Sequence, residues 1–135
     1  MHADWPIYLI ATELILPNEQ HVEARMLEVI ESMSSSGRWT MPIVLEKDSL
    51  AVMDGHHRLA AARHLALSRV PCLMLDYGQV TVEARRIGYC VDAEQIIKRS
   101  RSQMLYPPKT TRHIFSHALP PCDVDLSILR SNRAT

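Results

Sequence analysis

The feature that most constrains the fold is a strand–turn–helix unit between Leu50 and Ala66. Leu50 to Met53 is a short apolar run typical of a buried strand, and the polar turn Asp54 to Arg58 (DGHHR) follows it directly. The alanine-rich run from about Gly55 to Ala66 has the pattern of an amphipathic helix. An acid at a helix start caps free N–H groups, and those groups, the helix dipole and nearby cations attract anions. We therefore expect a phosphorylated ligand at this turn.

The remaining segments predict a small α+β domain around this unit. The expected strands are 7–12, 42–45, 50–53, 72–75 and 79–84, and the expected helices are 20–34, 55–66, 92–102 and a short one at 125–130. These elements alternate without a doubly wound pattern, which favours an α+β arrangement. The 135 residues fit one domain, 1–135, in which 104–135 is a loop-rich segment that completes the site.

Composition narrows the classes of partner. The 15 Lys and Arg residues balance the 15 Asp and Glu residues, so no broad positive field favours nucleic acid. Cys72, Cys90 and Cys122 lack CxxC spacing, which predicts free thiols rather than disulfides or a zinc site. No apolar run approaches the length of a membrane span, and no signal pattern begins the chain. We expect a cytoplasmic protein that binds neither nucleic acid nor membrane; its oligomeric state stays open.

Three polar clusters are the candidates for chemistry. The DGHHR turn is the first, and Pro17 to Gln20 (PNEQ), which places Glu19 just before a helix, is the second. The third, Pro107 to His113 (PPKTTRH), joins a rigid proline pair to two cations, two hydroxyls and an imidazole. Such groups suit phosphoryl transfer, which needs positioning, charge neutralisation and a carboxylate near the attacking hydroxyl.

The order of these segments resembles a known family. Five segments resemble, in composition and in order, those of the free serine kinases of the ParB/sulfiredoxin-like superfamily: PNEQ, SGRWTMPIVL, MDGHHRLAA, PCLMLDY and YPPKTTRH. The resemblance extends from about Leu14 to Asp125, with a gap in the middle. Those enzymes convert free L-serine to O-phospho-L-serine with ATP or ADP. The resemblance implies a ParB N-terminal/sulfiredoxin-like domain, a mixed sheet flanked by helices, and L-serine and a nucleotide as small-molecule partners.

The resemblance also implies residue roles. Glu19 occupies the position of the catalytic glutamate. The turn that handles the nucleotide phosphates corresponds to Asp54, Gly55, His56, His57 and Arg58. The loop that holds serine and phosphate corresponds to Lys109, Thr110, Thr111, Arg112 and His113, with Ser32 as a further substrate contact.

The chemistry of these side chains fits the implied roles. Glu19 orients the serine hydroxyl and takes its proton. The two histidines and both arginines neutralise phosphate charge, and Arg112 suits a bidentate grip on a carboxylate. Asp54, as a second catalytic acid, holds Mg²⁺ directly or through water. Two departures from the archaeal pattern, Asn18 in place of a histidine and a missing insertion before PKTTRH, leave ATP versus ADP open.

Alternatives exist at two levels. Each cluster has a structural interpretation: Asp54 as a plain N-cap, Glu19 as a solvated acid, the histidine pair as a structural polar cluster, and 109–113 as an ordinary loop. The whole chain has two competing functions. One is a non-catalytic ParB-like regulator that binds nucleotide or DNA. The other is sulfiredoxin-type chemistry, which places a cysteine where this chain has His56.

Overall fold

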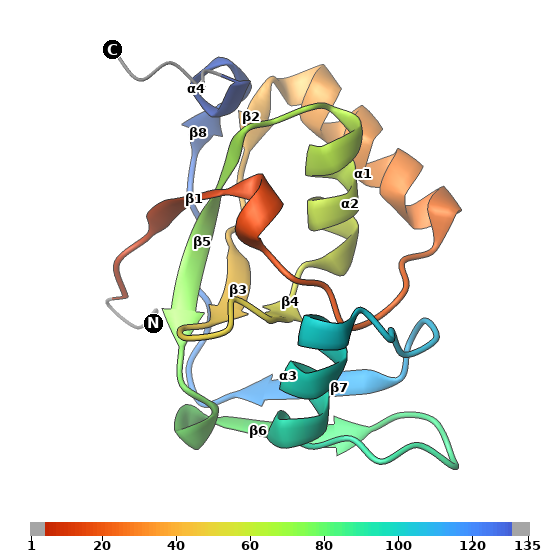
Figure 1. Ribbon diagram of the computed structural model, residues 1–135. Helices are drawn as coiled ribbons and strands as arrows, with labels where there is room; N and C mark the ends of the chain where they lie inside the picture. Colours follow the sequence, from red (N-terminus) through yellow and green to blue (C-terminus); the bar gives the residue numbers. More distant parts are fainter. Residues whose placement is uncertain (1–4, 131–135) are drawn as a thin grey trace.

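The computed structural model of the chain describes residues 5–130 and centres on a four-stranded mixed sheet (Figure 1). The strand order is β1 (Tyr8–Ala11), β5 (Arg69–Leu75), β3 (Ile43–Glu46) and β4 (Val52–Asp54). The β3–β5 pair is parallel, and the β1–β5 and β3–β4 pairs are antiparallel. The expected α+β fold with a mixed sheet is thus confirmed. The strand predicted from Cys72 starts three residues earlier, at Arg69.

Two helices lie side by side on one face of this sheet (Figure 1). They are α1 (Glu23–Ser36) and α2 (His56–His64). The core between the helices and the sheet is apolar, and its largest fully buried members include Ile15, Trp39, Leu45, Leu59 and Leu129. Helix α1 ends at Gly37, whose φ of 70° is the left-handed conformation that glycine adopts most readily. The packing places the first turn of α2 beside the segment that leads into α1.

A two-stranded sheet and a third helix form the lower part of the molecule in Figure 1. Strands β6 (Val80–Ala84) and β7 (Thr111–Phe115) pair antiparallel, and α3 (Ala93–Ser102), which lies between them in the chain, packs on this strand pair through buried Ile96. The short 3-10 helix η2 (Tyr77–Gln79) leads into β6, and η1 (Thr12–Leu14) follows β1. The segment predicted to be loop-rich, 104–135, contains strand β7, whose pairing with the distant β6 no local pattern indicated. Residues 131–135 of that segment lie outside the described residues.

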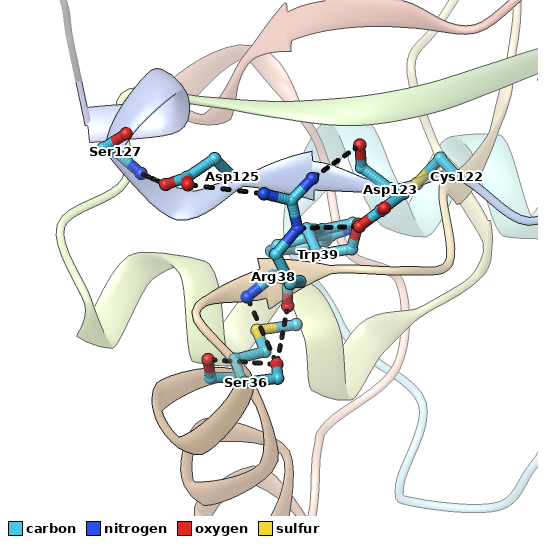
Figure 2. Close-up of polar contacts among 8 residues, drawn as sticks. Ser36, Arg38, Trp39, Cys122, Asp123, Asp125 and Ser127 are labelled. Atoms are coloured by element: carbon cyan, nitrogen blue, oxygen red, sulfur yellow. Dashed lines mark hydrogen bonds and ion pairs between the residues drawn. The ribbon is translucent and has the colours of Figure 1, made fainter.

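A two-stranded ribbon closes the other end of the molecule. It consists of β2 (Arg38–Trp39) and β8 (Val124–Asp125), and α4 (Leu126–Arg130) follows. Figure 2 shows the ion pairs that hold this ribbon together: the Arg38 guanidinium lies 2.7 Å from a carboxylate oxygen of Asp123 and 3.3 Å from one of Asp125. All three nitrogens of Arg38 are used, since the third donates to the Asp123 carbonyl. Neither short strand was predicted.

The cysteines of the described residues are free: Cys72 is buried, Cys90 is exposed and Cys122 is intermediate. Among residues 5–130, no helix is long and apolar enough to cross a membrane.

Candidate active site

A cavity of about 680 Å³ lies between α1, the first turn of α2 and the β6–β7 strand pair. Two carboxylates, Glu19 and Asp54, line it. Six cationic side chains line it as well: Arg25, Arg38, Arg58, Arg85, Lys109 and Arg112. Although the whole chain is neutral, the cavity wall is rich in positive charge and therefore favours an anionic ligand.

Glu19 is held by the PPKTTRH loop. Its Oε1 accepts the backbone N–H groups of Thr110 and Thr111 at 3.0 and 2.8 Å, and the Thr111 hydroxyl at 3.0 Å. Among the described residues no hydrogen bond uses Oε2 of this carboxylate. Glu19 is partly buried and lines the cavity, so Oε2 is the oxygen left for a ligand hydroxyl.

The first turn of α2 begins at a glycine rather than at the expected acid. Gly55 is the N-cap with φ 114°, no side chain caps the helix, and the interpretation of Asp54 as a plain N-cap is therefore wrong. A Cβ on Gly55 would lie 3.1 Å from Cγ1 of Ile43, so both conformation and space require glycine. Within residues 5–130 no acceptor bonds the N–H groups of His56, His57 or Arg58. This uncapped turn opens into the cavity and is suited to a phosphate.

The Arg58 side chain is engaged by other protein groups around the first turn of α2, so its guanidinium is not left unpaired for a ligand. Its guanidinium donates to the carbonyls of Met41 and Pro42 at 2.9 and 2.5 Å and to Oδ2 of Asp54 at 2.9 Å. The Arg58 side chain is 18% exposed and that of Asp54 is 45% exposed, so the carboxylate is the more accessible partner of this ion pair. The remaining oxygen of Asp54 has no protein partner among the described residues, and Asp54 lines the cavity.

His56 and His57 are hydrogen-bond acceptors, which the sequence did not indicate. Nε2 of His56 accepts the backbone N–H of Asn18 at 3.2 Å, and Nε2 of His57 accepts that of Val22 at 3.0 Å. Burial lowers the pKa of His56 to about 3, and burial together with the nearby Arg25 lowers the pKa of His57. The expectation that these two residues neutralise phosphate as cations is therefore wrong, because both are uncharged at neutral pH.

Strand β7 carries the third histidine of the cavity. Nε2 of His113 lies 2.8 Å from the Tyr77 hydroxyl, and the imidazole stacks on Phe115. Burial lowers the pKa of His113 to about 4 despite the nearby Asp54 carboxylate. His113 is thus also a neutral member of the cavity wall.

The PPKTTRH loop divides its side chains between structure and cavity. Thr110 is fully buried, its hydroxyl donates to the Pro107 carbonyl at 2.6 Å, and the cavity lining omits it. Lys109 adopts φ 60° and lines the cavity, and no ion pair within residues 5–130 engages it. Arg112 is exposed and lies 3.3 Å from a Glu83 carboxylate oxygen. Of the predicted substrate contacts, only Thr110 is kept away from the cavity.

Ser32 lines the cavity from α1, and this helix also brings residues that the sequence did not single out. Arg25, Val29 and Ser36 share its inner face, since they follow the spacing of one side of a helix. Arg85 at the end of β6 is another such residue. The helical spacing was a usable signal for Arg25; Arg85 had none, because its place depends on the pairing of β6 with β7.

Comparison with known proteins relates this chain to serine kinases. No family model matches it. The ATP-dependent L-serine kinase of Staphylothermus marinus is 35% identical over 81 residues, 57% of this chain and 32% of that protein. The ADP-dependent L-serine kinase of Thermococcus kodakarensis is 30% identical over 102 residues (71% and 42%), and a ParB-like protein of Sulfolobus acidocaldarius is 29% identical over 96 residues (71% and 48%). The chain spans about a third to a half of these relatives.

Solved structures show the same fold. A free serine kinase in complex with AMP superposes with a TM-score of 0.83 over 94% of this chain and 97% of that one, at 18% identity. The C-terminally truncated SbnI of Staphylococcus aureus superposes with a TM-score of 0.81 over 94% and 90%, at 12% identity. Other free serine kinase structures with AMP carry one glutamate replaced by glutamine or alanine.

Proposed function

We propose that the protein phosphorylates free L-serine to O-phospho-L-serine with ATP or ADP as the donor. Two of the named relatives are L-serine kinases, one ATP-dependent and one ADP-dependent, and the shared fold binds AMP in a free serine kinase. The observation that carries the proposal is the position of Glu19, whose carboxylate lies in a cationic cavity that also contains an uncapped helix start. A nucleotide donor agrees with the cytoplasmic location expected from the sequence.

Glu19 is the proposed general base. Its Oε1 is fixed by the PPKTTRH loop, so Oε2 accepts the proton of the serine hydroxyl. The serine oxygen attacks the terminal phosphorus of the nucleotide, and the bond from that phosphorus to the bridging oxygen breaks. The nucleotide leaves with one phosphate fewer. The protein contributes mainly position and charge, as in other phosphoryl transfers.

The phosphates are proposed to lie at the DGHHR turn. The N–H groups from His56 to Arg58, which have no acceptor within residues 5–130, are preorganised donors, and Lys109 and Arg85, which form no ion pair within the same residues, supply positive charge. Arg58 keeps the turn in shape through its carbonyl contacts. Asp54 is the residue that would hold Mg²⁺, because one of its oxygens has no partner in the described part of the chain and this ion needs few carboxylates when phosphates share it. A bound Mg²⁺ would add charge neutralisation.

Serine is proposed to bind between Glu19 and the polar wall formed by Ser32, Arg112 and His113. Arg112 can exchange its exposed Glu83 partner for the substrate carboxylate, since exposed ion pairs are weak. Thr111 contributes by holding Glu19, and Thr110 by fixing the loop through Pro107. Both threonines then act on the substrate through their neighbours.

The direct test is product formation. Purified protein is incubated with Mg²⁺, L-serine and either ATP or ADP, and phosphoserine is followed by ³¹P NMR and mass spectrometry. L-alanine, which lacks the hydroxyl, is the matched control and should yield no phosphorylated amino acid. Absence of phosphoserine with both nucleotides, in protein that still binds nucleotide, would overturn the kinase.

A second candidate is a ParB-like regulator that binds nucleotide or DNA without turnover. The ParB-like relative favours it, and so does the cationic lining of the cavity. Binding of a labelled DNA duplex that weakens steeply with salt, in protein inactive as a kinase, would support this function. Sulfiredoxin-type chemistry has no thiol at the site: the cavity lining contains no cysteine, and burial raises the pKa of Cys72 to about 12.

A further inference from the structure

Around Glu19, the backbone N–H groups of every second residue, 18, 20 and 22, donate hydrogen bonds to distant parts of the chain. The N–H of Asn18 is accepted by His56 at 3.2 Å, and that of Val22 by His57 at 3.0 Å. Between them, the N–H of Gln20 donates to the Tyr106 carbonyl at 2.8 Å. Glu19 therefore sits in a segment whose backbone is anchored on both sides.

The two imidazoles have a defined tautomer in this arrangement. A backbone N–H can only donate, so the ring nitrogen that faces it must be an unprotonated acceptor. For His56 and His57 this nitrogen is Nε2, which leaves the single ring proton on Nδ1. Each residue is then a neutral ring whose acceptor is committed to the segment before α1.

Because the two histidines are adjacent in the sequence, they reach two different points of the segment that leads into α1. Successive helix residues point about 100° apart, so neighbours in the first turn of α2 reach different points of a facing loop. His56 reaches Asn18 and His57 reaches Val22, four positions further along. Val22 is the N-cap of α1 and has no polar side chain to cap the helix, so an outside acceptor for its own N–H fixes the entry of the chain into α1.

We propose that His56 and His57 are positioning residues for Glu19, which fix the backbone of residues 18–22 through their Nε2 atoms instead of contacting phosphate as cations. This inference rests on the proposed kinase only for its kinetic consequence. The PPKTTRH loop fixes one oxygen of the Glu19 side chain, and the histidine pair fixes the main chain that carries it. Both are needed, because a displacement of about 1 Å in a catalytic group lowers rates by about 100-fold.

The first test needs no activity. ¹⁵N NMR of the histidine rings, with substrates absent and at neutral pH, distinguishes the two neutral tautomers and the imidazolium. We expect His56 and His57 to carry their proton on Nδ1, and His64, exposed at the end of α2, serves as the reference ring. An Nε2–H tautomer or a charged ring at either position overturns the proposal, whether or not the protein is a kinase.

The second test separates positioning from phosphate binding. His57→Phe keeps a ring but removes the acceptor, and kcat is expected to fall about 10- to 100-fold while the KM for nucleotide changes less than about twofold. His57→Gln, neutral but able to accept at a similar reach, should restore most of kcat. A large rise in nucleotide KM without rescue by glutamine would instead indicate phosphate contact and overturn the proposal.

Two controls keep the result interpretable. His64→Gln, which touches neither the cavity nor residues 18–22, should leave kcat and KM unchanged. Thermal melting identifies any variant that fails to fold. If His57→Phe is unfolded, His57→Asn replaces it, because asparagine is polar but too short to reach Val22. Equal kcat for the asparagine and glutamine variants would then contradict the inference.

Discussion

The hydroxyl oxygen of Tyr77 lies 2.8 Å from Nε2 of His113, at the point where β7 lines the cavity. Burial raises the pKa of this tyrosine and lowers the pKa of the histidine to about 4. The pair is therefore uncharged at neutral pH, and the imidazole resists protonation as long as the β6–β7 strand pair stays folded.

This depressed pKa makes the fold sensitive to acid. The contribution of neutral His113 to the free energy of unfolding is fully present above the unfolded-state pKa of 6.5. It is lost as the pH falls from 6.5 towards 4, because the unfolded chain takes up the proton first. A histidine with this shift lowers the free energy of unfolding by about 2 kcal/mol between pH 6.5 and pH 5. Urea unfolding at both pH values should show a smaller acid loss for His113→Gln than for wild type, and an unchanged loss for His64→Gln. An unaltered loss in His113→Gln would refute the assignment.

Glu19→Gln separates the two carboxylate oxygens. The amide oxygen can still accept from the backbone of Thr110 and Thr111, while the base is gone. We expect kcat for phosphoserine formation to fall about 100-fold or more, with stability and nucleotide affinity nearly unchanged. Glu23→Gln, an exposed acid in the first turn of α1, is the control. Activity near wild type in Glu19→Gln would remove the proposed base.

Gly55→Ala tests the requirement for glycine at the start of α2. Its positive φ and the 3.1 Å approach to Ile43 should together destabilise the protein by about 2 kcal/mol or more. Gly88 has φ 90° but no atom near its missing Cβ, so Gly88→Ala should lose only about 1 kcal/mol. Chemical unfolding measures both, and calorimetry should show weaker nucleotide binding for Gly55→Ala alone. Equal destabilisation would mean that the contact with Ile43 is unimportant.

Lys109→Gln tests the free cation of the PPKTTRH loop. Removal of a charge that lines the cavity should raise the nucleotide Kd about 10-fold and flatten its dependence on salt, as expected for a charge-assisted contact. Lys98→Gln, on the exposed side of α3, should do neither. Isothermal titration with ADP and ATP at two salt concentrations gives the answer, and identical behaviour of the two variants would exclude Lys109 from the nucleotide site.

Local patterns predicted the elements that are long or strongly apolar. The β3–β4–α2 unit and the helix at 92–102 are visible in the spacing of apolar residues and in the cap at Asp92. Strands β2 and β8 have two residues each, too few for any period, and β7 is a strand only because β6 pairs with it. Such elements are defined by distant partners, which sequence spacing does not contain.

The same distinction applies to the cavity. The resemblance to the free serine kinases predicted site residues that the fold does bring to the cavity wall, among them Glu19 and His113. Their individual states depend on the packing: Arg58 donates to two carbonyls 16 and 17 residues away, and His56 is partly buried and accepts the backbone N–H of Asn18. Residue type alone indicates neither that the Arg58 cation is engaged by the protein nor that the His56 ring is a neutral acceptor, because partners and burial decide both.

The contact between Glu19 and Thr111 joins positions 92 residues apart, and that between His57 and Val22 spans 35. Closing such long loops loses chain entropy before the contacts form, so folding rates fall as contacts become less local. Helices α1 and α3, in contrast, close only contacts between near neighbours. The geometry of the Glu19 carboxylate therefore depends on contacts between distant parts of the chain, and no isolated segment of the protein can reproduce it.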